Sequence, residues 1–172
     1  MIKIWLITIV LALTIKPTYR VKKKHTPIGK VELAAVLRDG HYAVFGDFPS
    51  KERLQVAWAQ VALENGQGYM TYNHNLGKIT SSKYKPYYVQ RNRFRSLKNF
   101  QDGAKLYWKV VDRLCSKSLQ YFDNGRPNAA AQQLHSCGYY GADAKLYGKE
   151  MSKLYRREAI VAVSQLTRYS DD

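Results

Sequence analysis

The sequence contains few acidic residues, few cysteines and no long apolar run. It has 13 Asp and Glu against 28 Lys and Arg, so its net charge is +15. Two cysteines in 172 residues exclude a disulfide-dense scaffold and a four-cysteine zinc site. No apolar run reaches the roughly 18 residues of a full transmembrane helix. An apolar fraction of 45% nevertheless argues against a disordered chain, and the length predicts one folded domain.

The N-terminus combines a positive start with an apolar stretch, residues 4–15. This pattern is typical of a secretory signal peptide. Lys16, Pro17 and Arg20 follow without a small-residue cleavage triplet, so the segment also fits an uncleaved membrane tether; a buried strand or helix is the alternative. We therefore expect a signal peptide or N-terminal membrane anchor with a basic tail in residues 1–25, followed by a domain in residues 26–172.

Apolar periodicity and turn residues predict a mostly helical α+β domain. Ser50 is placed to cap a helix over 51–64, in which Leu54, Trp58 and Val61 form an apolar stripe. Gly66 is suited to end that helix in a left-handed cap. Further helices are expected over 30–38 (ending at Asp39-Gly40), from about 97 to 122, over 127–136 and over 142–165. Residues 65–98 have little helical period, and we expect loops with a small hairpin there.

The irregular lobe is strongly basic. Residues 65–101 hold seven Lys and Arg and no acid, together with tyrosines that include Tyr72. Tyrosine rings stack on sugars and offer a hydroxyl, and the cations suit a polyanionic partner. Cations interleaved with aromatics also fit a nucleic-acid-binding module. The exported N-terminus and the lack of a helix-turn-helix, zinc-finger or RNP signature argue against it, so we expect no nucleic acid.

Glu64 is the candidate catalytic residue. It ends an apolar helix, Gln60 lies one turn before it, and a glycine-rich stretch follows, so its carboxylate can lie at the edge of a cleft. Partial burial would raise its pKa and suit it to act as a general acid. By spacing alone, an ordinary solvated carboxylate at a helix end is the simpler interpretation.

Four motifs that follow one another along the chain favour a catalytic role for Glu64 over an ordinary solvated carboxylate. They are Trp58-Ala-Gln-Val-Ala-Leu-Glu-Asn-Gly-Gln-Gly68, Asn73-His-Asn-Leu-Gly-Lys-Ile79, Phe94-Arg-Ser-Leu-Lys-Asn-Phe-Gln-Asp-Gly103 and Gly138-Tyr-Tyr-Gly-Ala-Asp-Ala-Lys-Leu-Tyr147. Over about residues 50–157 this pattern resembles the lysozyme-like peptidoglycan hydrolases of the glucosaminidase and flagellar-muramidase type, glycoside hydrolase family 73.

The resemblance implies a lysozyme-like helical domain with a small irregular or β lobe. It implies a glycosidase or lytic transglycosylase that cleaves peptidoglycan glycan strands, with Glu64 as the catalytic acid. Tyr147 matches a tyrosine of the family's cleft, and Asn73 and Asn75 match the segment that shapes its floor. Together with Tyr72 and Gln60 we take these three as candidate substrate-binding residues. The implied location is the periplasm, the cell wall or the outer face of the inner membrane. A non-catalytic wall-binding protein is the alternative.

This chain departs from the family pattern at Asn65, where the family has Ser or Thr, and at Lys78. The acid-free lobe is the larger departure, because a two-carboxylate hydrolase needs a second acid. Asp39, Asp47, Asp102 and Asp143 stay possible. The sequence favours a single-acid mechanism, in which the sugar's own N-acetyl group or C6 hydroxyl is the nucleophile.

The scattered histidines have no metal-ligand spacing, and we expect no metal or other cofactor. Cys115 and Cys137 can pair in an exported domain, or they can be two buried free thiols.

Overall fold

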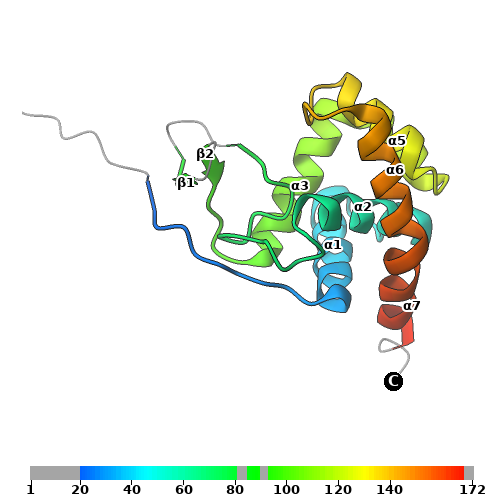
Figure 1. Cartoon of the computed structure of the whole chain (residues 1–172). Helices are drawn as coiled ribbons and strands as arrows, with labels where there is room; N and C mark the ends of the chain where they lie inside the picture. Colours follow the sequence, from blue (N-terminus) through cyan, green and yellow to red (C-terminus); the bar gives the residue numbers. More distant parts are fainter. Residues whose placement is uncertain (1–19, 81–84, 90–92, 169–172) are drawn as a thin grey trace, which may run out of the picture.

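The computed structural model describes residues 20–80, 85–89 and 93–168, without the side chains of the last two (Figure 1). It confirms a mostly helical α+β fold. The helices are α1 (Lys30–Phe45), α2 (Lys51–Glu64), α3 (Phe100–Cys115), α4 (Leu119–Asp123), α5 (Pro127–Ser136), α6 (Ala144–Leu154) and α7 (Ile160–Arg168). Strands β1 (Tyr87–Val89) and β2 (Arg93–Arg95) form the expected hairpin, an antiparallel pair with Tyr88 opposite Phe94.

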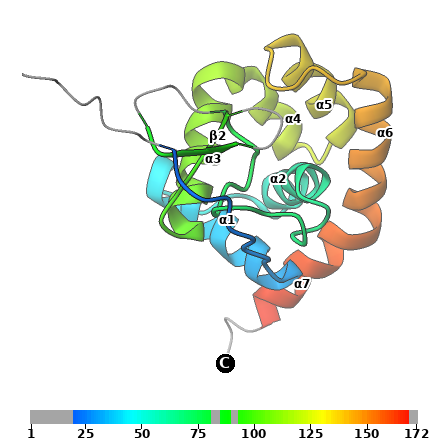
Figure 2. The same cartoon turned by 60° about the vertical axis from the view of Figure 1, so that its left-hand side comes forward.

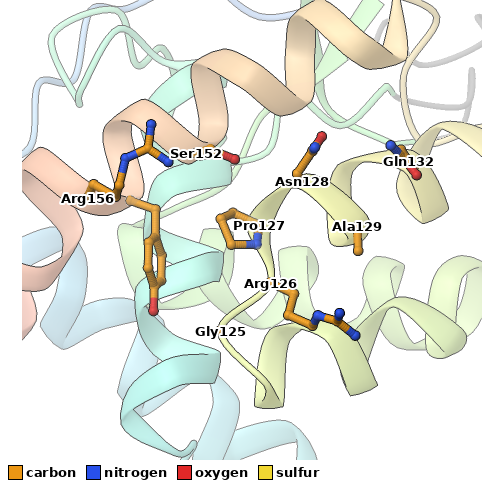
Figure 3. A pocket seen from close by; sticks show the side chains of 9 residues that line it. Gly125, Arg126, Pro127, Asn128, Ala129, Gln132, Ser152 and Arg156 are labelled. Carbon is orange, nitrogen blue, oxygen red and sulfur yellow. The ribbon is translucent and has the colours of Figure 1, made fainter.

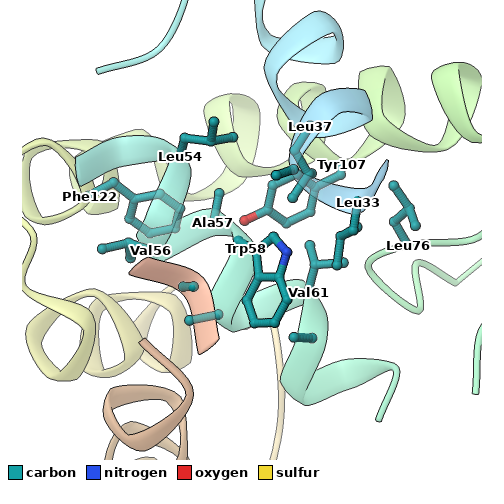
Figure 4. Close-up of a cluster of buried hydrophobic side chains, with 14 of the residues drawn as sticks. Leu33, Leu37, Leu54, Val56, Ala57, Trp58, Val61, Leu76, Tyr107 and Phe122 are labelled. Carbon is teal, nitrogen blue, oxygen red and sulfur yellow. The ribbon is translucent and has the colours of Figure 1, made fainter. Parts of the chain in front are cut away.

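Helix α2 is the centre of the fold. Figure 2 shows it nearly end-on, with the other helices and the hairpin lobe around it. Ser50 caps it as predicted, because its Oγ accepts from the Arg53 amide at 3.1 Å. The predicted stripe is too narrow, since every residue from Leu54 to Ala62 is buried. A helix that is apolar nearly all round belongs in a core. Figure 4 shows its side chains packed against those of α1, α3 and α4.

Helix α1 is longer than predicted. We expected it to end at Asp39-Gly40, but it continues to Phe45, and Gly46 ends it at a φ of 85°. The reason lies in the crossing with α3. A Cβ on Gly40 would lie 2.5 Å from the Cβ of Ala104, so this glycine permits a close helix–helix approach. Gly40 was predicted to end the helix from its local sequence, but in the structure it lies inside the helix and allows α1 to pack closely against α3.

The second half of the chain contains two differences in helix boundaries. The helix expected from 97 to 122 breaks after Cys115 into a 3₁₀ turn, Ser116–Ser118, before α4. The last helix begins at Ala144, where the carboxylate of Asp143 caps the Leu146 amide at 2.7 Å, and a π-helical segment, Tyr155–Ala159, joins α6 to α7. Helix α5 has the predicted bounds, with Pro127 at its first position.

Cys115 and Cys137 form a disulfide, which settles the alternatives left open by the sequence. Their Cα atoms lie 5.6 Å apart, within the ordinary range for a bridge. The bond joins the end of α3 to the turn that follows α5.

Residues 20–25 belong to the folded unit, although the sequence assigned them to a basic tail. The amide of Val21 donates to the Tyr87 carbonyl at 2.8 Å, and the Asn73 amide donates to the Lys24 carbonyl at 2.9 Å. The predicted signal peptide or tether, including residues 4–15, lies outside the described residues. Within the part of the chain that the structure describes, no helix has both the length and the apolar character to span a bilayer.

Candidate active site

Glu64 lies where α2 leaves the core. It is the last residue of the helix and is half-buried, whereas the preceding turns are buried. Gly66 follows at a φ of 53°, as predicted, and turns the chain away from the helix axis. The carboxylate therefore lies at the edge of the core, on the side where the irregular lobe begins.

Tyr147 of α6 is the direct partner of Glu64. Its hydroxyl donates to Oε1 of Glu64 at 2.7 Å, across 83 positions of sequence. The Tyr147 ring stacks on Tyr140, with centroids 3.8 Å apart and planes 15° from parallel. The Tyr140 hydroxyl in turn donates to the carbonyl of Ala131 in α5 at 2.8 Å. The tyrosine that faces the carboxylate is thus held by a second ring that is anchored to a neighbouring helix.

Burial raises the pKa of Glu64 above its ordinary value. The hydrogen bond from Tyr147 and the positive charge of Lys78 act in the opposite direction, but they do not cancel the loss of solvation. Burial and the nearby Glu64 charge raise the pKa of Tyr147 as well, so its hydroxyl keeps its proton and stays a donor. The pair is therefore an acid with an increased tendency to hold a proton and a neutral donor that orients it.

Gln60 faces the buried Tyr107 and the half-buried Tyr139, one turn before Glu64. It is fully buried, and its Oε1 accepts from the Tyr107 hydroxyl at 2.5 Å. Its Nε2 forms no well-aligned hydrogen bond within the described residues, but Gln60 faces the Tyr139 hydroxyl closely enough to lower the pKa of that group. Tyr139 lies beside the same site, and its hydroxyl donates to the Gly77 carbonyl at 3.3 Å. Burial raises the pKa of Tyr139, and the charge of Glu64 adds to this effect.

Asn73 and Asn75 support the loop that borders the site. The side-chain Nδ2 of Asn75 donates to the main-chain carbonyls of Ile79 and Arg95 at 2.9 and 3.0 Å, and its Oδ1 accepts from the main-chain amide of Ile79. The side chain of Asn73 bonds to the main chain of the docked N-terminal segment and to Ser96. Both amide groups are thus engaged in holding the loop, which suits the role of shaping a cleft floor.

Tyr72 lies on the other side of that loop. Its ring packs beside His25, with centroids 5.4 Å apart, and Lys23 Nζ lies 3.8 Å from its centroid. Among the described contacts, none joins Tyr72 to Glu64. The structure thus places Tyr147 and Gln60 next to the acid, Asn73 and Asn75 beneath the loop, and Tyr72 on the docked N-terminal segment.

Sequence reasoning missed the role of Asn65. This residue is buried, and its Nδ2 donates to the carbonyls of Val61 and Leu76, which ties the end of α2 to the loop over 73–79. Sequence analysis flagged Asn65 only as a departure from the family pattern. Its signal was its place immediately after Glu64, where a side-chain amide can reach back one turn of helix.

Within the described part of the chain, no second carboxylate influences the pKa of Glu64. Among the described residues, the charged group that influences its pKa is Lys78. Asp39 pairs with Arg38 at 2.8 Å, Asp47 lies beside His41, and Asp102 is in the first turn of α3. The fourth candidate, Asp143, caps α6, and its charge reaches Tyr140. Of the four, Asp143 is the one whose charge raises the pKa of a tyrosine at the site, Tyr140.

A separate hollow lies at the turn before α5 (Figure 3). Its volume is about 480 Å³, and its lining includes Arg126, Pro127, Asn128 and Arg156. None of its lining residues belongs to the pair of Glu64 and Tyr147. In the described ranges, no group of three or more His, Cys, Asp or Glu is arranged to hold a metal ion.

The chain matches no protein-family model, no curated protein and no solved structure. The resemblance to the peptidoglycan hydrolases therefore stays a hypothesis, and the geometry around Glu64 is the main support for a function.

Proposed function

We propose that the protein cleaves the glycan strands of peptidoglycan, with Glu64 as the general acid. The observation that supports this most directly is the contact between Glu64 and Tyr147. A half-buried carboxyl with a raised pKa, held by a neutral donor, is suited to give a proton near neutral pH. An ordinary solvated carboxylate at a helix end has neither property.

The hydrogen bond assigns different roles to the two carboxyl oxygens. Tyr147 occupies Oε1 of Glu64. Oε2 is then the oxygen that carries the proton and gives it to the glycosidic oxygen of the bound strand. The bond to the leaving sugar breaks as that oxygen is protonated, and positive charge develops on the sugar that remains.

The surroundings of Glu64 favour a single-acid mechanism. Because no second carboxylate among the described residues influences the pKa of Glu64, the substrate would supply the nucleophile, either its N-acetyl oxygen or its C6 hydroxyl. Attack by the C6 hydroxyl closes a 1,6-anhydro ring, and the proton of that hydroxyl returns to the Glu64 carboxylate. A two-acid reaction would instead need Asp143 or a residue outside the described ranges.

The lobe is consistent with a polyanionic wall polymer. It carries an excess of positive charge with no acid between residues 65 and 101, and long-range attraction concentrates such a protein on a negatively charged surface. The apolar N-terminal segment would deliver the domain to the cell envelope as an exported or tethered protein. A non-catalytic wall-binding protein would use the same lobe but would not need Glu64.

The test is digestion of purified sacculi with residues 20–172, which keep the docked segment that a start at residue 26 would cut. Three proteins are compared: wild type, Glu64→Gln, and Glu32→Gln as a matched control at an exposed site. We expect release of muropeptides by wild type and the control, and a loss of about 100-fold or more with Glu64→Gln.

Mass spectrometry of the products separates the mechanisms. A 1,6-anhydro end indicates single-acid transglycosylation, and a reducing end indicates hydrolysis. Sacculus binding without release by any of the three proteins would refute catalysis and favour the wall-binding alternative. If no sacculus binding is seen either, binding to a single-stranded oligonucleotide is the next assay, because Arg93 over Tyr87 and Lys23 over Tyr72 also suit stacked bases.

A further inference from the structure

A groove runs from the candidate active site along the exposed side of α3. Near the site it is a hollow of about 210 Å³ between the loop at Gly77–Thr80 and the end of α3, bordered by Tyr139. A second hollow of about 640 Å³ shares Ile79, Thr80, Val110 and Arg113 with the first. The two hollows therefore adjoin along the loop and α3, and we call them together the groove, which begins beside Tyr139 and extends toward Arg95.

The charged residues that line the groove are mainly positive. Lys78 and Arg113 line the part near the site, and Arg95 and Lys109 line the extension, against one acid, Asp112. Within the described residues, none of these four cations forms an ion pair with a carboxylate. Lys78 also lowers the pKa of Glu64, so its charge reaches the candidate catalytic acid.

Both walls of the groove are held in place. The side chain of Asn75 holds the loop through three hydrogen bonds, and Lys78 adopts a left-handed conformation with a φ of 47°. Such a conformation is unfavourable for lysine and persists only where the surrounding structure imposes it. On the opposite wall, the disulfide directly follows Arg113 and Leu114 and directly precedes Gly138 and Tyr139.

We infer that this groove binds the carboxylate-bearing part of the glycan substrate, with Lys78 and Arg113 as the residues that select it. The inference deepens the proposed function and rests on it. Leu114 is 49% exposed and offers an apolar surface to a sugar ring, while the two cations suit a carboxylate beside that ring. In peptidoglycan such a carboxylate belongs to the stem peptide or, on an N-acetylmuramic acid that carries no peptide, to the lactyl ether.

The sharpest probe is a pair of ligands that differ in that carboxylate. We would titrate Glu64→Gln with N-acetylglucosaminyl-N-acetylmuramic acid and with di-N-acetylchitobiose, and follow binding by NMR. A muramyl dipeptide separates the stem-peptide source from the lactyl source, because its lactyl carboxyl is tied up as an amide and its one free carboxylate lies on the peptide. The expected result is tighter binding of a carboxylate ligand, by about threefold to tenfold, with the preference reduced at high salt.

Two further proteins assign the preference to the groove. Adding Lys78→Met and Arg113→Met together should abolish the preference without changing the binding of the neutral disaccharide. Lys51→Met is the matched control, because Lys51 is an exposed lysine at the other end of α2, and it should leave the preference intact.

Equal affinity for the acidic and neutral ligands, no binding of any of them, or a preference that survives the double change would each overturn the inference. Sacculus digestion by the wild type is a separate readout. Cleavage by a protein that has no preference would refute the groove while leaving the proposed function in place. A preference without cleavage would refute the catalytic proposal alone.

Discussion

Removal of the disulfide gives a prediction whose size follows from the chain itself. Cys115 and Cys137 are 22 positions apart, and the bond joins α3 to the turn after α5. Closing a loop of that length lowers the entropy of the unfolded chain, and the chain-entropy relation gives about 3 kcal/mol at 25 °C. For a domain of this size that corresponds to a decrease in Tm of about 6–12 °C. The change to test is the double variant Cys115→Ala and Cys137→Ala.

The assay is thermal unfolding of both proteins with and without a reductant. Reductant should lower the Tm of the wild type toward that of the double variant, and it should not change the double variant. This internal control separates the effect of the bond from the effect of losing the two sulfur atoms. Labelling of the denatured, unreduced wild type should find no free thiol. Detection of two free thiols, or a wild-type Tm that does not change with reductant, would refute the stabilising role of the disulfide.

Three further predictions concern the site and its support. Glu64→Gln should raise Tm at pH 7 more than at pH 4, because a carboxyl whose pKa is raised on folding costs stability as the pH rises above its ordinary value; equal effects at both pH values would contradict this. Tyr147→Phe and Lys78→Met each remove an influence that lowers the pKa of Glu64, so the alkaline limb of the pH–rate profile should move to higher pH; an unmoved limb would argue against Glu64 as the acid. Gly103→Ala should lower the free energy of unfolding, measured in urea, by about 1–3 kcal/mol, because the new Cβ would lie 2.1 Å from the carbonyl oxygen of His74 in the loop. Gly141→Ala is the control and should be nearly neutral, because a Cβ there would meet open space.

The elements that sequence predicted best are those whose boundaries are encoded locally. Ser50 begins α2 through its own side chain, and Pro127 is fixed at the first position of α5. Gly40 shows the opposite case, because the close approach that requires it comes from α3, more than sixty positions away. The break after Cys115 is also non-local, since the disulfide and the turn at Ser116–Ser118 fix the end of α3 against another helix.

The candidate site divides in the same way. Periodicity placed Glu64 at a helix end, but it could not pair that residue with Tyr147, which is 83 positions away and on another helix. Only the order of motifs suggested that meeting. The bonds of Asn73 and Asn75 to the docked N-terminal segment and the hairpin lobe could not be read from composition, because they depend on how those segments return to the loop.

Three features that disfavour stability converge on one small region. A carboxylate at the C-terminal end of a helix opposes the helix dipole, and Glu64 occupies that position in α2. Burial adds a second cost, because it raises the pKa of the same group. The left-handed conformation of Lys78, whose charge reaches Glu64, adds a third. A surface carboxylate, a solvated helix end and a glycine in the loop would each be more stable.

Positions where a chain departs from the locally favourable choice are where a functional requirement is expected. Among the described residues, Lys78 is the cation that acts on Glu64, and it leaves the pKa of the acid raised. A purely structural partner would be placed to neutralise the carboxylate fully. The arrangement therefore favours an acid that must release and regain a proton over one that only holds the fold together.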